Sequence, residues 1–308
     1  MGYRPALSAA AIPLTHMVEA TDERGRSTLT AMPAERALTI YVDKRELVTL
    51  MTLGARPEWL VLGYLRNQRL IGSIDEVDSI TVDWETGAAA VKTRSGIERI
   101  EERTSRRIVT TGCGQGSVFG GLMDEIEEIR LPDTVITQAE LYGIVNAIRL
   151  QESTYKSAGS VHGCALFRGQ EMLLFVEDVG RHNAIDTIAG WMWLNMAPTL
   201  AAEAPALPPE GALPPRDGPS AVDRRRAAGL VFYTTGRLTS EMVIKSAQMG
   251  VAVVVSRSGI TQMGHQIAHR FGLCAIGRAT NKRFLCYTAL ERLKLQPALA
   301  GPNLRAAP

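Results

Sequence analysis

The stretch that decides the fold is Phe175-Val-Glu-Asp-Val-Gly-Arg-His-Asn-Ala-Ile-Asp186, in which an apolar run ends in a cluster of charged residues. Residues 172–176 are continuous and apolar, as expected of a strand that is buried on both faces. Beyond them, four residues recur at helical spacing: Arg181, Ile185, Ile188 and Met192. The polar residues between these two patterns therefore fall at a strand-to-helix turn. In parallel α/β sheets, ligands bind at such turns.

Composition is typical of an ordinary globular protein. The chain has 308 residues, of which 45% are hydrophobic and 21% charged, and this length suggests about two domains. The net charge of +2 is too small to indicate binding to nucleic acid. The four cysteines show no C-x-x-C spacing, which favours a reducing, cytoplasmic compartment over a secreted disulfide framework. No apolar run reaches the length of a membrane span.

Changes in pattern along the chain predict its organisation. Residues 1–33 lack periodicity, which predicts a flexible tail. Residues 34–105 predict a small α+β unit with two β-hairpins and one helix. Residues 106–125 are polar and rich in glycine, which predicts a mobile loop. Residues 126–308 alternate strands with helices, which favours a mostly parallel sheet covered by helices. Within them, the Pro/Ala-rich residues 197–228 predict a disordered insertion without a functional role.

The loops that follow the predicted strands carry many cations. Because parallel strands place these loops at one edge of a sheet, we expect the cations to lie together there. They are Arg181, Arg237, Lys245, Arg257, Arg278, Lys282 and Arg283. Hydroxyl groups and glycine amides lie between them, which favours a phosphorylated ligand. The chain contains neither a G-x-x-x-x-G-K-[ST] loop nor a G-x-G-x-x-G turn into a helix, so a standard nucleotide triphosphatase or Rossmann site is not indicated.

Three motifs resemble a known protein family in their order and spacing. They are residues 177–186, Thr235-Gly236-Arg237 followed by residues 240–247, and Thr111-Gly112-Cys113-Gly114. Together they resemble the FdhD family of formate dehydrogenase accessory sulfurtransferases. The resemblance extends over most of the chain and leaves out the N-terminal tail and the Pro/Ala-rich insertion.

The resemblance implies a function. Members of this family are cytoplasmic homodimers that take sulfur from a cysteine desulfurase as a protein persulfide. They pass it to the molybdenum (or tungsten) bis(molybdopterin guanine dinucleotide) cofactor that formate dehydrogenase requires. The resemblance also implies a cytidine-deaminase-like α/β main domain, with the cofactor as a bound substrate and no resident metal.

The resemblance also assigns residues to this function. It makes Cys113 the persulfide-bearing residue. The cofactor-binding segment implied by the family is Arg278, Ala279, Thr280, Asn281, Lys282 and Arg283. We expect four further residues to line the cofactor pocket: Arg181, His182, His162 and Arg237. Asp178 and Asp186 are expected to fix the turn and the helix.

The loop around Cys113 suits sulfur transfer but departs from the family pattern. A persulfide carrier needs a thiolate on a flexible loop without bulky neighbours, and glycines at 112, 114 and 116 meet this requirement. Many family members have Cys-x-x-Cys here, whereas this chain has Gly116 in place of the second cysteine. A relay through one thiol is therefore predicted, with Cys164, Cys274 and Cys286 mostly structural. The alternative is a cofactor-binding chaperone that moves no sulfur.

A zinc-dependent hydrolase is the competing prediction from another class, because a deaminase-like fold can bind zinc. Zinc deaminases combine H-x-E with a later P-C-x-x-C. This chain has His162-Gly163-Cys164 and lacks any C-x-x-C. The second pair of zinc ligands is therefore missing, and we favour the sulfur carrier.

Overall fold

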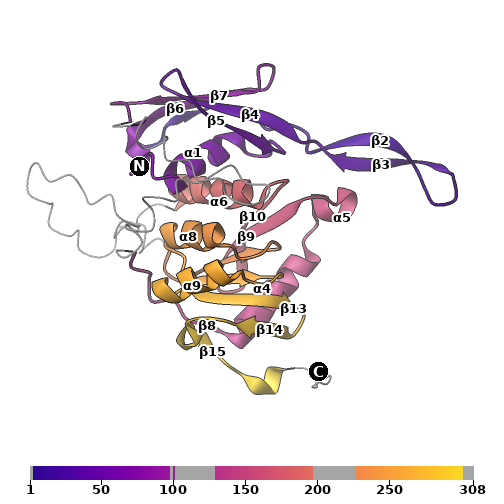
Figure 1. Cartoon of the computed structure of the whole chain (residues 1–308), viewed down its shortest axis with the longest axis vertical. Coiled ribbons are helices and arrows are strands. Elements are labelled where there is room, and N and C mark those ends of the chain that lie inside the picture. The colour runs from indigo at the N-terminus through magenta and orange to yellow at the C-terminus, as the bar shows by residue number, and fades with distance from the viewer. Residues whose placement is uncertain (1–2, 98–99, 101–128, 197–226, 301–308) are drawn as a thin grey trace, which may run out of the picture.

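The computed structural model describes residues 3–97, 100, 129–196 and 227–300. The predicted loop at 106–125, including Cys113, lies outside these residues, as does the predicted insertion up to residue 226. The described part contains two principal sheets, one from the N-terminal third of the chain and one from the remainder (Figure 1). No helix among the described residues is long and apolar enough to cross a membrane.

The N-terminal sheet has five strands in the order β1-β6-β7-β4-β5. They are β1 (Ala6–Leu7), β4 (Arg36–Val42), β5 (Arg45–Thr52), β6 (Val77–Asp83) and β7 (Ala88–Thr93). Helix α1 (Pro57–Asn67) packs its apolar residues on this sheet in one core cluster, and Pro57 occupies the first turn, where its missing N–H is not needed. A short 3₁₀ helix, Ile74–Glu76, precedes β6. Both predicted hairpins and the predicted helix are present.

A two-stranded arm projects from this sheet. β2 (Thr15–Thr21) and β3 (Ser27–Pro33) pair antiparallel and extend away from the body of the protein (Figure 1). The prediction of a flexible tail over residues 1–33 is therefore wrong, since β1, β2 and β3 all lie in this range. The arm carries apolar residues on its surface, including Met17 and Leu29, so it lacks the alternation of buried and exposed positions that identifies a strand in a sequence.

The main sheet has six strands in the order β10-β9-β11-β12-β13-β14. They are β9 (His162–Arg168), β10 (Glu171–Asp178), β11 (Leu230–Thr234), β12 (Val253–Ser256), β13 (Cys274–Thr280) and β14 (Arg283–Cys286). Only the β11–β12 and β12–β13 pairings are parallel. The prediction of a mostly parallel sheet is therefore wrong: the sheet is mixed, because the tight β9–β10 and β13–β14 hairpins each reverse the chain.

Helices cover both faces of the main sheet. One face packs against α6 (Arg181–Asn195), α8 (Ser240–Gln248) and α9 (Gln262–Phe271), and the other against α4 (Gln138–Leu150). The remaining short elements are α5 (Thr154–Ala158), β8 (Ile136–Thr137), β15 (Leu293–Lys294) and the 3₁₀ turns Leu290–Arg292 and Pro297–Leu299. The described residues thus form a three-layer α/β main domain. Its relation to cytidine deaminases stays a prediction.

Helices α1 and α6 join the two sheets (Figure 1). Glycines allow a very close crossing: a Cβ atom on Gly63 would lie 1.7 Å from the Asp186 backbone oxygen, and one on Gly190 would lie 2.0 Å from the Trp59 oxygen. Arg66 Nη1 donates to the Ala189 backbone oxygen at 3.0 Å across the same contact. The N-terminal sheet is therefore fixed against α6, the helix that begins just after strand β10 ends.

Candidate functional site

Four strands of the main sheet end at one edge. Because β9 is antiparallel to both β10 and β11, those two strands run in the same direction, and β12 and β13 follow them. The carboxyl ends of β10, β11, β12 and β13 therefore share this edge, as the sequence predicted. In such sheets, this edge is where ligands bind.

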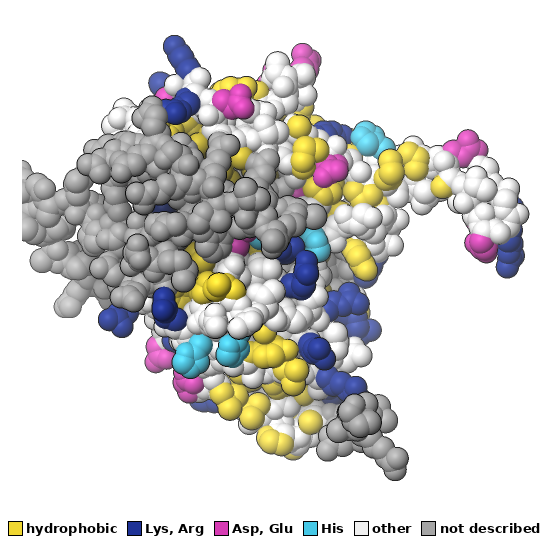
Figure 2. Space-filling model, in the orientation of Figure 1, with side chains coloured by type: hydrophobic (Ala, Val, Ile, Leu, Met, Phe, Trp, Pro, Cys, Tyr) yellow, Lys and Arg dark blue, Asp and Glu magenta, His cyan; other side chains and the backbone are white. Residues whose placement is uncertain are grey.

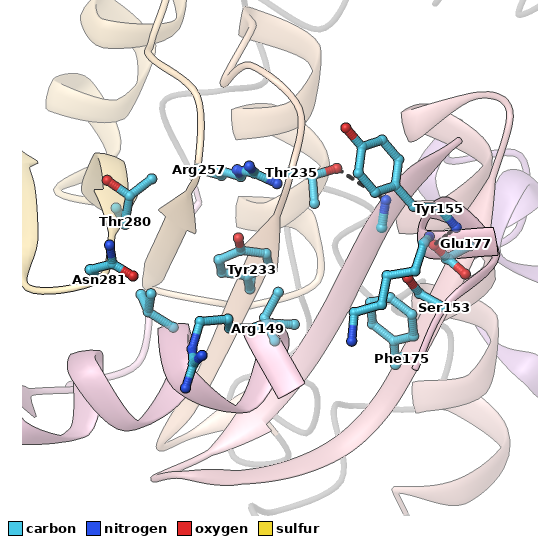
Figure 3. Close-up of a pocket in the computed structure, with 15 residues that line it drawn as sticks. Arg149, Ser153, Tyr155, Phe175, Glu177, Tyr233, Thr235, Arg257, Thr280 and Asn281 are labelled. Carbon is cyan, nitrogen blue, oxygen red and sulfur yellow. Dashed lines mark hydrogen bonds between the residues drawn. The ribbon is translucent and has the colours of Figure 1, made fainter. Parts of the chain in front are cut away.

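A cavity of about 350 Å³ opens at this edge, on the face covered by α4 (Figure 3). This volume is in the range of small-molecule sites. Its apolar walls come from Val145, Ile148, Phe175, Tyr233 and Ala279. Its polar lining comes from Arg149, Ser153, Tyr155, Lys156, Glu177, Thr235, Arg257, Thr280 and Asn281. Burial raises the pKa of Tyr233 to about 12, so its hydroxyl stays protonated.

The cavity wall depends on a close pairing of β9 with the loop after β11. The Gly163 N–H donates to Thr235 Oγ1 at 3.0 Å, and the Thr235 N–H donates to the Gly163 oxygen at 2.9 Å. A Cβ atom on Gly163 would lie 3.0 Å from the Phe175 ring. Glycine at this position therefore lets the ring lie against the backbone and form one wall of the cavity.

Glu177 holds α5 at the mouth of the cavity. Its carboxylate accepts from the Thr154 N–H at 2.5 Å and the Tyr155 N–H at 3.1 Å, which caps the first turn of this short helix. The capped turn carries Tyr155 and Lys156, and both line the cavity. Glu177 thus positions an exposed aromatic ring and a cation at the opening.

The residues of the predicted cofactor segment do not all lie at the cavity. Ala279, Thr280 and Asn281 line it. Arg278, Lys282 and Arg283 are exposed and are not among its lining residues. Arg278 and Asn281 both have a positive φ, at 51° and 50°, where the register of β13 and β14 shifts. This irregular backbone separates the lining residues from the exposed cations.

The other four predicted residues form a second group at the start of α6. Arg181 and His182 are buried, His162 is half-buried and Arg237 is exposed. Burial, followed by the charges of Arg181 and Arg237, lowers the pKa of His162, so these three side chains interact electrostatically. A Cβ atom on Gly236 would lie 3.0 Å from Arg181 Cδ, so the loop after β11 passes directly over this arginine. Residues 235–237 thus run from the cavity to the second group.

His182 belongs to a buried network of polar and charged groups. Its Nε2 lies 3.0 Å from Glu241 Oε2. Burial lowers the pKa of His182 to about 2, aided by the charges of Lys245, Arg181 and His162, so the imidazole is neutral and makes a polar contact rather than an ion pair. Lys245 Nζ lies 2.8 Å from Asp186 Oδ2 and 3.9 Å from Glu241 Oε1. Lys245 was predicted to lie at the ligand edge, and this prediction is wrong, because its side chain is 4% exposed and its ammonium group is paired inside the protein.

Asp178 and Asp186 are framework groups, as predicted. Asp178 Oδ2 accepts from Thr52 Oγ1 at 2.5 Å and from the Leu53 N–H at 3.2 Å. Thr52 is the last residue of β5 in the N-terminal sheet, and Leu53 follows it. Asp178 Oδ1 accepts from the Gly180 N–H at 3.0 Å and from Asn183 Nδ2 at 2.9 Å. The second oxygen of Asp186 accepts from Asn67 Nδ2 at 2.7 Å. These carboxylates therefore hold the N-terminal sheet to the start of α6.

Sequence reasoning missed several cavity residues, notably Arg149, Tyr155 and Lys156. Arg149 lies in the last turn of α4, and the other two lie in a helix of five residues, which is too short to show helical periodicity. The available signal was Ser153, whose side chain accepts from the Lys156 N–H at 3.3 Å as a helix cap.

Cys164 is a structural residue. It is fully buried, its thiol donates to Thr234 Oγ1 at 3.3 Å, and burial raises the pKa of the thiol to about 12. Within the described ranges, no cluster of three or more His, Cys, Asp or Glu side chains could hold a metal ion. His162 and Cys164 therefore lack the additional described ligands that a zinc site requires.

Comparison with known proteins identifies the family. The model of the FdhD/NarQ family matches residues 33–203 and 218–294. The sulfur carrier protein FdhD of Bacillus licheniformis is 27% identical over 264 residues, which cover 85% of this chain and 90% of that protein. The Bacillus subtilis protein of the same name is 27% identical over 268 residues, with the same coverage. A crystal structure of a protein from Desulfotalea psychrophila, described as a formate dehydrogenase accessory protein, shares the fold with a TM-score of 0.66. The two sequences are 22% identical, and the match covers 91% of this chain and 100% of that one. The chain therefore belongs to the FdhD/NarQ family.

Proposed function

We propose that this protein is a sulfur carrier that accepts sulfur from a cysteine desulfurase on Cys113 and transfers it to the molybdenum or tungsten bis(molybdopterin guanine dinucleotide) cofactor of formate dehydrogenase. Its relatives bear the name sulfur carrier protein, and a structural neighbour is described as a formate dehydrogenase accessory protein. One observation carries the proposal. Three residues of the cofactor segment line a cavity that also carries three cations.

The lining of the cavity suits one nucleotide end of such a cofactor. The apolar walls can accept a flat base, and Arg149, Lys156 and Arg257 can pair with phosphate oxygens. Figure 2 shows Lys and Arg side chains along the right-hand side of the main domain, below the arm. An anionic ligand is attracted to such a surface before it binds.

The chemistry at Cys113 begins with a thiolate. It attacks the outer sulfur of the donor's persulfide, the donor's S–S bond breaks, and the donor leaves as a thiolate. Cys113 then carries the persulfide. Delivery of the outer sulfur as sulfide consumes two electrons, which a thiol reductant can supply. Because residue 116 is glycine, a second thiol at that position of the loop does not supply them.

Gly116 also favours a second candidate function. A protein that binds the cofactor and hands it to formate dehydrogenase without moving sulfur needs neither thiol of a Cys-x-x-Cys pair. This chaperone would bind guanine nucleotides in the same cavity. The two candidates differ in whether Cys113 is required.

Co-expression separates the two candidates. Formate dehydrogenase is expressed with wild type, with Cys113→Ser, or with Ser117→Ala as a control in the same loop. The sulfur carrier predicts an active enzyme with wild type and the control, and loss of activity with Cys113→Ser. Full activity with Cys113→Ser contradicts the sulfur carrier and supports the chaperone.

Two further interactions, with a second copy of the chain and with a cysteine desulfurase, are testable without formate dehydrogenase. We propose that the protein is a homodimer that binds a cysteine desulfurase transiently. Light scattering after size-exclusion chromatography measures the mass against the 33.4 kDa of one chain. A monomer at micromolar concentration contradicts the dimer. Crosslinking with the desulfurase in the presence of L-cysteine tests the second interaction.

A further inference from the structure

Two cysteines lie close together on neighbouring strands of the main sheet. Cys274 begins β13, and Cys286 ends β14, which is its antiparallel neighbour. Their sulfur atoms are 3.8 Å apart. Both side chains belong to the core cluster under α4, and Cys274 lies at the opposite end of β13 from the cavity residues Ala279 and Thr280. This pair is therefore separate from the site described above.

The environment makes the two thiols unequal. Cys274 is fully buried, whereas Cys286 is partly exposed on the outer strand. The hydrogen bond between the two thiols lowers the pKa of Cys286, and the same contact, with burial, raises the pKa of Cys274. Cys286 is therefore the more accessible and more readily ionised sulfur. The Cys274 sulfur lies 3.8 Å from the Cys286 sulfur, close enough to react with it.

We propose that Cys274 and Cys286 form a dithiol site that reacts with low-molecular-weight disulfides and closes into an intramolecular disulfide. The Cys286 thiolate attacks one sulfur of the reagent, whose S–S bond breaks and releases one thiolate. Cys274 loses its proton and attacks the Cys286 sulfur of the mixed disulfide, which releases the second thiolate. The two cysteines lose two electrons and two protons, and the reagent becomes two thiols.

The geometry permits this closure. A disulfide bond of about 2.05 Å requires the two sulfurs to approach by about 1.8 Å. Cys286 is opposite Ile276 in the register, so the two cysteines are diagonal neighbours, and closure combines side-chain rotation with a small adjustment of the outer strand β14. The bond would join the two strands of the hairpin whose turn holds Asn281 and Lys282. Oxidation would therefore restrain the hairpin that contributes to the cavity. The reaction requires neither Cys113 nor the proposed sulfur transfer.

The test uses the full chain carrying Cys113→Ser, which leaves three cysteines. The folded protein is incubated with oxidised glutathione, denatured and alkylated, and its thiols are counted by mass spectrometry. The expected result is loss of two of the three alkylated sites, a protein lighter by two hydrogens, and a crosslinked peptide pair containing Cys274 and Cys286. Cys164 should remain alkylated, since it is buried on β9 and two strands, β11 and β12, separate it from β13 and Cys274.

Two variants identify the order of attack. Cys274→Ser should stop at the glutathione mixed disulfide on Cys286, and Cys286→Ser should leave Cys274 reduced. Circular dichroism verifies that each protein is folded. Alkylation of all three cysteines after excess oxidised glutathione, or crosslinking that involves Cys164, would overturn the proposal. Because the parent protein gives the main readout, a variant that fails to fold does not weaken the test.

Discussion

The close crossing of α1 and α6 makes Gly63→Ala the most informative change for the fold around the site. A Cβ atom there would lie 1.7 Å from the Asp186 backbone oxygen, whereas real Cβ contacts are essentially never under 3.0 Å. The helices must therefore separate by more than 1 Å. Because the second atom is backbone on a buried helix, a side-chain rotation cannot relieve this overlap.

The magnitude follows from the contacts across the crossing. Inserting a methyl group into a packed core costs about 1–3 kcal/mol. Separation also lengthens two buried hydrogen bonds, Asn67 to Asp186 at 2.7 Å and Arg66 to Ala189 at 3.0 Å, each worth about 1 kcal/mol. We expect Gly63→Ala to lower the free energy of unfolding by about 3–5 kcal/mol in total.

Urea denaturation followed by circular dichroism measures this free energy. Gly259→Ala is the matched control, since a Cβ atom there meets nothing within 4 Å and its φ is not in the positive range. The control should change the free energy by less than about 1 kcal/mol. If Gly63→Ala were as stable as the control, the two helices would not cross as closely as described, and α1 would not fix the position of α6.

Three further changes test the network and the cavity. Lys245→Met leaves the buried Asp186 carboxylate without its cation, so we expect urea denaturation to show a loss of about 3–5 kcal/mol; a loss under about 1 kcal/mol contradicts the pairing. The pKa of His182 is about 2 in the folded protein, whereas a histidine in the unfolded chain has a pKa of about 6.5. The contribution of neutral His182 to stability is therefore complete above pH ~6.5 and is lost as the pH falls from there toward 2. From about pH 6 to pH 5, wild type should lose about 1 kcal/mol more unfolding free energy than His182→Gln, and equal losses would refute the neutral, buried imidazole. Arg257→Ala should weaken GDP binding about tenfold in isothermal calorimetry, while Arg270→Ala, at an exposed residue outside the cavity, should leave it unchanged; equal affinities would contradict the proposed role of Arg257 in binding phosphate.

Local patterns were sufficient to predict the centre of the site. The apolar run before Glu177 and the helical spacing after Gly180 correctly predicted a strand, a turn and a helix. The glycine and hydroxyl residues of Thr235-Gly236-Arg237 correctly indicated a loop at the same edge. These features depend on neighbours in the sequence, so periodicity and turn chemistry are enough to find them.

The remaining features depend on contacts between distant residues. Lys245 looked like a ligand-binding cation, and only its pairing with Asp186 shows it to be structural. The direction of β9 between β10 and β11 cannot be read from strand periodicity, which is the same in parallel and antiparallel pairs. The arm at 15–33 gave no signal, because its strands do not alternate between a core and solvent.

Detection of sulfur on Cys113 tests the central claim most directly. The protein is incubated with a cysteine desulfurase and L-cysteine, digested without reductant, and the peptide that contains Cys113 is analysed by mass spectrometry. The sulfur-carrier account predicts one added sulfur on this peptide that a thiol reductant removes, and its loss in Cys113→Ser. An unmodified Cys113 peptide, in a preparation where the desulfurase itself carries persulfide, would contradict the account.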